Sequence, residues 1–398
     1  MIFNKMWMRE YLSCILGNVF VVVQICLALF LVNIQVGTIV LETEHLNSMA
    51  ATDSDTYLFQ YAMAAAGLYG VEADYEEVCG KIRSLPGVAG MGELFDQSVS
   101  VAGDSEKYPD NEYSMIGMDS IVTSAVTYRM KEGRWLNEGD REGVMIHIVL
   151  GGAIADRYSI GDILTIELEN EESSQNYEVE VVGKLADHCN VLDLCCLSAE
   201  QDMNSFMQER MNGIFVNHRE VFGKMKKDGF GYSTAHCVVK LDSDADKDFL
   251  SGYGKIVSFD EMKRELKEWL HGFLAEAVEE MILWVVVIIF GIIASSYLVG
   301  KRRRYVWGIY LMLGEKPGHL LKIQMVSNGI AYTAGALISL AAYRCYYSSM
   351  ETSMMADISR YHIITDLIFL AIMLVISLVS NWYIMKIEPK EILTQTKE

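Results

Sequence analysis

The chain has 398 residues, a formal net charge of −20 and a hydrophobic content of 51%. This acidity argues against binding to nucleic acid or to anionic lipid headgroups. The length allows two or three domains, and much of the apolar content is concentrated in a few long uncharged runs.

Four of these runs are long enough to cross a bilayer as helices, because about 20 apolar residues span the hydrocarbon core. They lie between Glu10 and Glu42, at Met281–Gly300, between Lys322 and Arg344, and between Asp366 and Lys386. The first run is too long for the core of a cleaved signal peptide, so we expect an uncleaved anchor.

Basic residues predict the orientation of these helices, since Lys and Arg are enriched in cytoplasmic loops. Lys5 and Arg9 precede the first run, and the 301–322 loop has six Lys/Arg against Glu315 alone. Three lysines follow the last run, namely Lys386, Lys390 and Lys397. We therefore expect a multi-pass protein of the cell (plasma or inner) membrane, with both termini cytoplasmic and residues 43–280 outside.

The expected fold class is an α-helical membrane protein with four transmembrane helices and one large extracytoplasmic α+β domain between helices one and two. The predicted organisation, in chain order, is as follows: 1–42, an interfacial helix and the first span; 43–72, a stalk helix; 73–258, the outer domain; 259–300, a second stalk helix and span; 301–322, a cytoplasmic segment; 323–398, the last two spans and a tail.

The outer segment 43–280 has 44 of the 53 acidic residues and 20 of the 33 basic ones. Its patterns predict helices at 57–66, Asp74–Ser84, Ala199–Met211 and Phe259–Glu280, and strands at Ile163–Leu168, Tyr177–Val182 and Cys237–Leu241, with an apolar run, Val144–Leu150, around His147. The helix at Phe259–Glu280 is amphipathic and runs directly into the second span.

Polar groups inside the first span have two interpretations. Asn18, Gln24, Asn33 and Gln35 either mark a path through the membrane or bond to neighbouring helices, and packing is the commoner role.

Metal and disulfide motifs are weak. Cys79, Cys189, Cys195, Cys196 and Cys237 lie in the outer segment, and both a disulfide from Cys189 to Cys195 or Cys196 and free thiols fit the spacing. His188-Cys189 with Cys195-Cys196 matches no common zinc pattern, and Asp242-x-Asp244-x-Asp246 lacks the turn glycine of a calcium loop. We expect no metal site and no catalytic residue.

The cytoplasmic loop has an amphipathic segment, Tyr305–Leu313, that is too short to span. Gly314 suits the left-handed end of a helix, and Pro317 suits the first turn of the next one. We expect a short helix on the inner membrane face, which is either an ordinary connector or a contact for a cytoplasmic partner.

Several motifs of this chain carry a resemblance to a known family. Arg302-Arg303-Arg304…Gly308-Ile309-x-x-x-Leu313-Gly314 resembles the segment after the second membrane helix of FtsX/MacB-type ABC transporter permeases, although Val306 and Leu311 replace an acidic and a basic residue. Gly133-Arg134-Trp135-Leu136-Asn137-x-Gly139-Asp140 and Ile160-Gly161-Asp162 resemble blocks of the MacB-type extracytoplasmic core domain, and Ile387–Leu393 resembles the closing motif. Gly133 and Gly139 permit turns and Trp135 needs burial, so we expect a structural corner there.

The resemblance implies a permease subunit without an ATPase of its own. ATP and Mg would bind to a separate ABC ATPase subunit, and this chain would bind no cofactor. A second permease chain, identical or similar, would complete the assembly. The implied coupling residues are Arg302, Arg303, Arg304, Gly308, Ile309, Leu313, Gly314 and Pro317.

The implied activity is mechanotransmission, in which ATPase motion reaches the outer domain and acts on a peptide, lipid or lipoprotein there. The alternative is a sensor, or an activator of a cell-wall hydrolase, with the same architecture. The substrate and its direction of movement do not follow from the sequence.

Overall fold

The computed structural model describes residues 15–61, 75–104, 113–169, 174–194, 207–209, 212–228, 236–243, 245–349 and 357–385. The chain divides into two compact units. The helical unit comprises Met1–Leu41 and Gly272–Glu398, and the α+β unit comprises Glu42–His271. The predicted interfacial helix at 1–12 and the closing motif at 387–393 lie outside the described residues.

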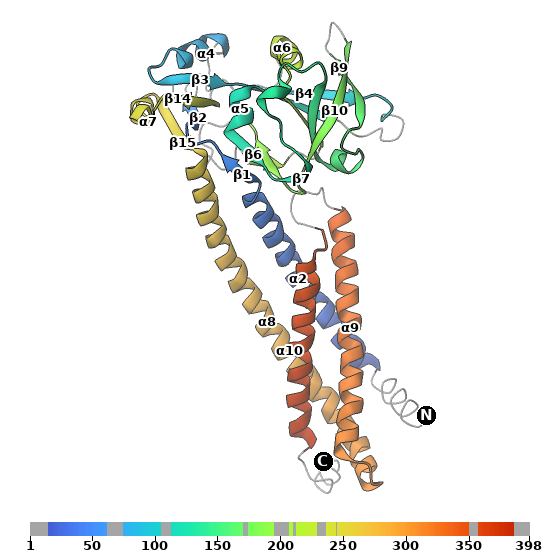
Figure 1. The fold of residues 1–398 in the computed structure, drawn as a ribbon. Coiled ribbons are helices and arrows are strands. Elements are labelled where there is room, and N and C mark those ends of the chain that lie inside the picture. The colour runs from blue at the N-terminus through green and yellow to red at the C-terminus, as the bar shows by residue number, and fades with distance from the viewer. Residues whose placement is uncertain are drawn as a thin grey trace. The chain divides into compact units, whose positions relative to one another are not determined.

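The helical unit is formed by four long helices, which are α2 (Ile15–Leu46), α8 (Phe259–Met312), α9 (Pro317–Ser349) and α10 (Arg360–Met385). α9 and α10 run side by side (Figure 1). Residues of α2, α9 and α10 share one apolar core that includes Ile25, Leu29, Val32, Tyr332 and Met373.

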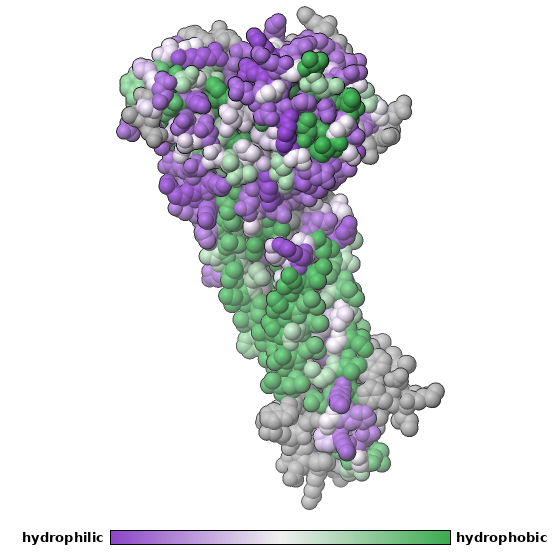
Figure 2. All heavy atoms as spheres, viewed as in Figure 1, coloured by the Kyte–Doolittle hydropathy of each residue, from purple (hydrophilic) through white to green (hydrophobic). Residues whose placement is uncertain are grey.

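Among the described residues, three helical segments are long and apolar enough to cross a membrane: Val19–Leu46, Pro317–Ser348 and Arg360–Val379. The fourth predicted span, Met281–Gly300, lies within α8, where several side chains are outside the description, so the count of four stays a prediction. Its described side chains at Ile282, Leu283, Val287 and Phe290 are apolar and exposed. Figure 2 shows such hydrophobic side chains along the helices of this unit, as expected for surfaces that contact lipid.

A closed sheet forms the larger part of the α+β unit. Its strand order is β7-β10-β8-β13-β5-β4-β9, and β9 also pairs with β10, which closes the strands from β10 to β9 into a ring and leaves β7 paired beside β10. The strands are β4 (Leu94–Val101), β5 (Tyr113–Met118), β7 (Met130–Gly133), β8 (Ile146–Gly152), β9 (Ile163–Glu169), β10 (Ser174–Leu185) and β13 (Asn212–Val216). The β10–β8 and β13–β5 pairs are parallel, and the others are antiparallel.

An antiparallel sheet of order β15-β2-β14-β3 forms the second part. Its strands are β2 (Thr56–Tyr61), β3 (Val88–Gly92), β14 (His236–Leu241) and β15 (Gly254–Ser258). Two short pairs join β1 (Met49–Thr52) to β6 (Val126–Tyr128) and β11 (Asn190–Leu192) to β12 (Met207–Glu209). The short helices are α4 (Tyr75–Arg83), α5 (Ser120–Ala125), η1 (Glu138–Asp140), η2 (Ala153–Asp156), α6 (Arg219–Asp228) and α7 (Ala245–Leu250).

The predicted stalk helix at 43–72 is wrong for the described residues after Leu46. α2 ends at Leu46, and Met49–Thr52 and Thr56–Tyr61 form strands. β2 lies between β14 and β15, with Leu58 in one apolar core and Tyr57 and Phe59 in another. A strand that is buried on both faces has a continuous apolar sequence, which resembles that of a buried helix.

Two further helix predictions need correction. Met207–Glu209, within the predicted helix Ala199–Met211, forms a strand that pairs with β11. The cytoplasmic segment is not a separate short helix, because α8 continues without interruption to Met312. Lys and Arg are good helix formers, so the basic residues 301–304 do not interrupt α8. The change from apolar to basic residues there predicts the end of a membrane span and not the end of a helix.

The other expectations for this unit agree with the structure. The helix predicted at Asp74–Ser84 is α4, and the three predicted strands are β9, β10 and β14. The apolar run around His147 is β8. The amphipathic helix that begins at Phe259 is the start of α8.

Candidate functional site

The turn between α8 and α9 brings together most of the predicted coupling residues. The Glu315 amide donates to Tyr310 O at 3.0 Å and the Gly314 amide donates to Leu311 O at 3.1 Å. These two bonds, with Gly314 at φ +91°, form a Schellman cap that ends α8. Pro317 then begins α9. Both predictions for this turn, the left-handed Gly314 and Pro317 in the first turn of α9, are confirmed.

The end of α8 is held against α9 by aromatic and aliphatic side chains. Trp307 and Leu320 are buried together, and Tyr310 and Leu311 pack on them. The predicted coupling residue Gly308 is also buried, and Ile309 is half-buried. Leu311 therefore has a packing role at the position where the family motif has a basic residue.

Two apolar side chains at this turn have no such cover. Met312 is 59% exposed and Leu313 is 76% exposed. Beside them, His319 Nδ1 lies 2.9 Å from Glu315 Oε2. The side chains of Arg302, Arg303 and Arg304 lie outside the description, although their backbone is part of α8. An exposed apolar tip flanked by polar residues is typical of a protein contact.

The Gly133–Asp140 block forms a corner of the α+β unit. Trp135 is buried, donates through Nε1 to Thr123 O at 3.2 Å, and packs edge-on against Tyr128. Gly133 has φ +74°, and a Cβ on it would lie 2.3 Å from Val182 O. Leu136 is buried in the same core as Trp135. The geometry is that of a packed turn, as the sequence predicts.

An ion pair between the exposed Arg134 and the buried Asp140 holds this corner together. Arg134 donates to Asp140 through both Nη atoms at 2.6 and 2.7 Å, and His147 Nδ1 lies 2.6 Å from Asp140 Oδ1. Burial alone raises the pKa of the Asp140 carboxyl, but hydrogen bonds from Arg134, the Asn137 amide and His147 lower that pKa to about 2. Asn137 accepts from the Gly139 amide at 2.9 Å and completes a capping box.

The Gly161-Asp162 turn meets this corner on β10. The Gly161 amide donates to Val181 O at 2.8 Å, while the Arg134 amide donates to Val182 O at 3.1 Å. Gly161 has φ +86°, and Asp162 accepts from the Ser159 amide at 2.7 Å. Both motifs therefore hold β10 in place.

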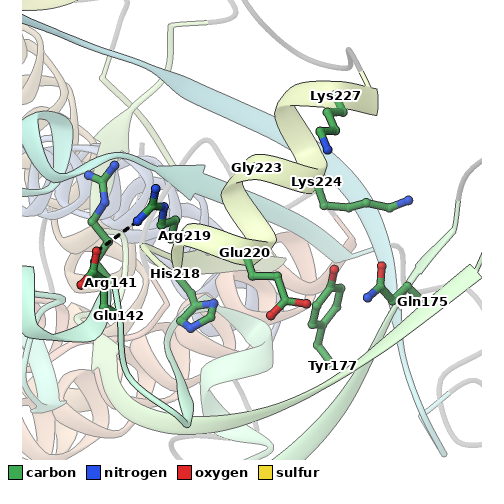
Figure 3. Close-up of a pocket in the computed structure, with 10 residues that line it drawn as sticks. All are labelled: Arg141, Glu142, Gln175, Tyr177, His218, Arg219, Glu220, Gly223, Lys224 and Lys227. Carbon is green, nitrogen blue, oxygen red and sulfur yellow. Dashed lines mark hydrogen bonds and ion pairs between the residues drawn. The ribbon is translucent and has the colours of Figure 1, made fainter.

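A pocket beside α6, of about 610 Å³, has no counterpart in the sequence predictions (Figure 3). It is lined by Arg141, Glu142, Gln175, Tyr177, His218, Arg219, Glu220, Gly223, Lys224 and Lys227. Four of these residues are basic and two are acidic, and Arg219 pairs with Glu142 at 3.3 Å. The excess of positive charge favours anionic groups. Its residues come from separate elements, so no local sequence pattern reveals it.

Two histidines face one carboxylate at the start of the α+β unit. His188 Nδ1 lies 3.1 Å from Glu209 Oε1, and His45 Nε2 lies 3.5 Å from Glu209 Oε2. Burial raises the pKa of Glu209, but hydrogen bonds from His188 and His45 outweigh it and lower that pKa to about 2. The hydrogen bond to Glu209 in turn raises the pKa of His188.

The cysteines give no structural support for a disulfide or a metal. Cys79, Cys189 and Cys237 are buried, and among the described residues they form no disulfide. Cys195 and Cys196 lie outside the described residues. Within the described ranges, no group of three or more His, Cys, Asp or Glu is placed to hold a metal ion.

Comparison with known proteins gives weak likenesses. No protein-family model matches the chain, and no curated protein matches it either. The periplasmic region of MacB from Actinobacillus actinomycetemcomitans is 11% identical, with a TM-score of 0.30, over 54% of this chain and 94% of that one. The extracellular domain of the noncanonic ABC-type transporter YknZ from Gram-positive bacteria is 16% identical, with a TM-score of 0.27, over 55% of this chain and 95% of that one. Likenesses with such low TM-scores do not show the family of this chain.

Proposed function

We propose that this chain is the membrane-spanning permease subunit of an FtsX/MacB-type ABC transporter, and that it transmits the motion of a separate ATPase to its α+β unit. The sequence motifs support the family, and the apolar helices support a place in the membrane. The observation that supports transmission is α8, a single helix from Phe259 to Met312.

The first turn of α8 is fixed in the α+β unit. Phe259 and Met262 are fully buried in its core. The Thr52 hydroxyl donates to Asp260 Oδ1 at 2.5 Å, and Lys263 Nζ donates to Met49 O at 2.8 Å. A displacement of this turn must therefore move the strands to which it is bonded.

The last turn of α8 ends at the exposed apolar tip formed by Met312 and Leu313. In the proposed mechanism an ATPase subunit binds this tip, and ATP binding at a dimer of ATPase subunits displaces it. Because a helix is stiff along its axis, the displacement reaches Phe259 as a shift or rotation of the whole helix. The moving α+β unit then acts on a peptide, lipid or lipoprotein outside the membrane.

The partner interface is tested by Leu313→Glu. A carboxylate at this exposed position leaves the fold of α8 intact but prevents burial in an apolar interface, so we expect co-purification with the cognate ATPase to fall at least tenfold. The matched control is Val144→Glu, at a fully exposed apolar position in the α+β unit. Undiminished co-purification of Leu313→Glu would remove the coupling role of this tip.

A second function, sensing by a complex of the same architecture, is favoured by the basic pocket beside α6. In this version an anionic ligand binds the pocket and changes the ATPase rate of the assembled complex. Arg219→Glu is then expected to abolish the response to the ligand and to leave the basal ATPase rate unchanged. A response that survives this substitution would exclude the pocket as the sensory site.

A further inference from the structure

A cluster of buried polar side chains lies among α2, α9 and α10 in the helical unit. Its members are Asn33 on α2, Ser339 and Tyr343 on α9, and His362 and Asp366 on α10. Asn33 Nδ2 donates to Ser339 Oγ at 3.3 Å, and the rings of Tyr343 and His362 have centroids 4.7 Å apart. Five buried polar side chains are unusual in helices that are apolar enough to cross a membrane, since polar side chains are costly there.

Gly37 on α2 makes room for this cluster. A Cβ on Gly37 would lie 2.0 Å from Tyr343 Oη and 3.4 Å from His362 Nε2. The helices therefore approach closely at the position where the Tyr343 hydroxyl and the His362 ring are buried, and small residues commonly permit such close approach in membranes.

Asp366 is the unusual member. It is 6% exposed, and within the described part of the chain neither of its carboxyl oxygens has a hydrogen-bond partner. The Asn33 side chain is its polar neighbour. Asn33 Oδ1 and His362 Nε2 also lack partners among the described residues. An ionised carboxylate left in this state would cost several kcal/mol, because burial removes its water and the neighbouring Asn33 amide replaces only part of that hydration.

One proton removes this cost. A protonated carboxyl has an O–H donor, and Asn33 Oδ1 is an acceptor without a donor. His362 does not supply a compensating positive charge, since its Nδ1 accepts from the Ser359 amide at 3.1 Å, which assigns the neutral ring with its hydrogen on Nε2. Besides Asp366, the titratable groups in the cluster are Tyr343 on α9 and His362 on α10, while α2 contributes the uncharged Asn33.

A metal cation fits this cluster less well. Calcium takes about six to eight oxygen ligands. Among the described residues of the cluster, the oxygens without a hydrogen-bond partner are the two of Asp366 and one of Asn33.

We infer that Asp366, with Asn33, forms a proton-binding site in the helical unit. In the bound state the site is a neutral carboxylic acid whose O–H donates to Asn33 Oδ1. In the unbound state the carboxylate needs a donor, and Nε2–H of His362, four residues earlier and so on the same face of α10, is the nearest candidate along that helix. The inference requires only that these helices lie in a membrane, and it is independent of any ATPase partner.

The test is infrared spectroscopy of the full chain in lipid nanodiscs. At neutral pH the wild type is expected to show the C=O band of a protonated carboxyl, and Asp366→Asn is expected to lose it. Asp357→Asn is the control, because Asp357 is half-exposed and pairs with Arg344 at 3.8 Å, so the band should remain. Superimposable spectra of the wild type and Asp366→Asn would overturn the proposal.

Two further measurements keep the test decisive. If Asp366→Asn does not fold, Asp366→Glu retains an acid, and the band should shift in frequency; a band that does not shift contradicts the assignment. Thermal unfolding is also compared in sodium and in N-methylglucamine at equal ionic strength. We expect equal midpoints, whereas a sodium-dependent rise that is absent in Asp366→Asn would show a metal cation as the occupant and overturn the proton.

Discussion

At the scale of residues, the α+β unit depends on a few buried charges with specific partners. Asp140 is nearly inaccessible, yet it is bonded to Arg134, the Asn137 amide and His147. This arrangement explains why a tryptophan, two glycines and an acid lie within eight residues of sequence: they form one corner that holds β10. The sequence Gly133–Asp140 predicts that a structural corner forms there. It does not predict the contact with His147, which comes from β8 and lies outside the motif.

Asp140→Asn tests this corner. It keeps the shape of the side chain and removes the charge, so we expect a loss of about 2 kcal/mol in the free energy of unfolding. Because the folded pKa of Asp140, about 2, lies below its ordinary value of 3.8, the wild type should lose this stability as pH falls from about 4 to about 2. Thermal unfolding across that range checks it. A variant that keeps the same acid dependence as the wild type would contradict the assignment.

Glu209→Gln tests the two-histidine cluster with the opposite dependence on pH. Glu209 raises the pKa of His188, so its contribution is complete below the ordinary histidine pKa of 6.5 and is lost as pH rises through the raised value. We expect the variant to be about 1–2 kcal/mol less stable near pH 6, with a smaller deficit in alkali. Denaturant unfolding of both proteins at several pH values measures it. A deficit that grows with pH would be inconsistent with the pairing.

At the scale of elements, burial on two faces limits what periodicity can predict. β9 and β10 have a regular pattern of turns and apolar residues and were predicted correctly, whereas β2 has Tyr57, Leu58 and Phe59 buried in succession and was taken for a helix. The continuity of α8 was predicted only to Gly300, since the change from apolar to basic residues marks the membrane boundary and says nothing of the backbone.

The α8–α9 turn supplies a matched pair of substitutions. Gly314→Ala places a Cβ on a residue with φ +91°, so we expect a loss of about 1 kcal/mol. Gly318→Ala lies in the first turn of α9, where a Cβ meets nothing within 4 Å, and should be neutral or stabilising by up to about 1 kcal/mol. Thermal unfolding in detergent compares them. Equal effects of the two substitutions would show that the left-handed cap does not matter for stability.

At the scale of the whole molecule, the sequence predicts the segregation into apolar helices and an acidic α+β unit, and the structure has both. The sequence did not predict sites whose residues lie far apart in the chain. The pocket beside α6 joins residues from 141 to 227, the two-histidine cluster joins residues 45, 188 and 209, and the Asp366 site joins three helices. Such sites depend on tertiary contacts, which no local spacing contains.

The central claim is that α8 transmits force as one rigid helix, and an insertion after Gly272 tests it most directly. A Cβ on Gly272 would meet nothing within 4 Å, so the point of insertion itself is not packed against a neighbour. One chain receives two turns of Gly/Ser-rich sequence, and the control receives two turns of Ala, Glu and Lys, which extend the helix. A fluorescent non-natural amino acid replaces Val144, which is fully exposed, in both chains and in the uninserted protein.

The measurement is the ATP-dependent change in this fluorescence for the complex with its ATPase in liposomes. If α8 transmits force as a rigid helix, the signal change persists in the uninserted protein and in the helical insertion, and is lost in the flexible insertion while ATP hydrolysis continues. A full signal change in the flexible insertion would contradict transmission along α8.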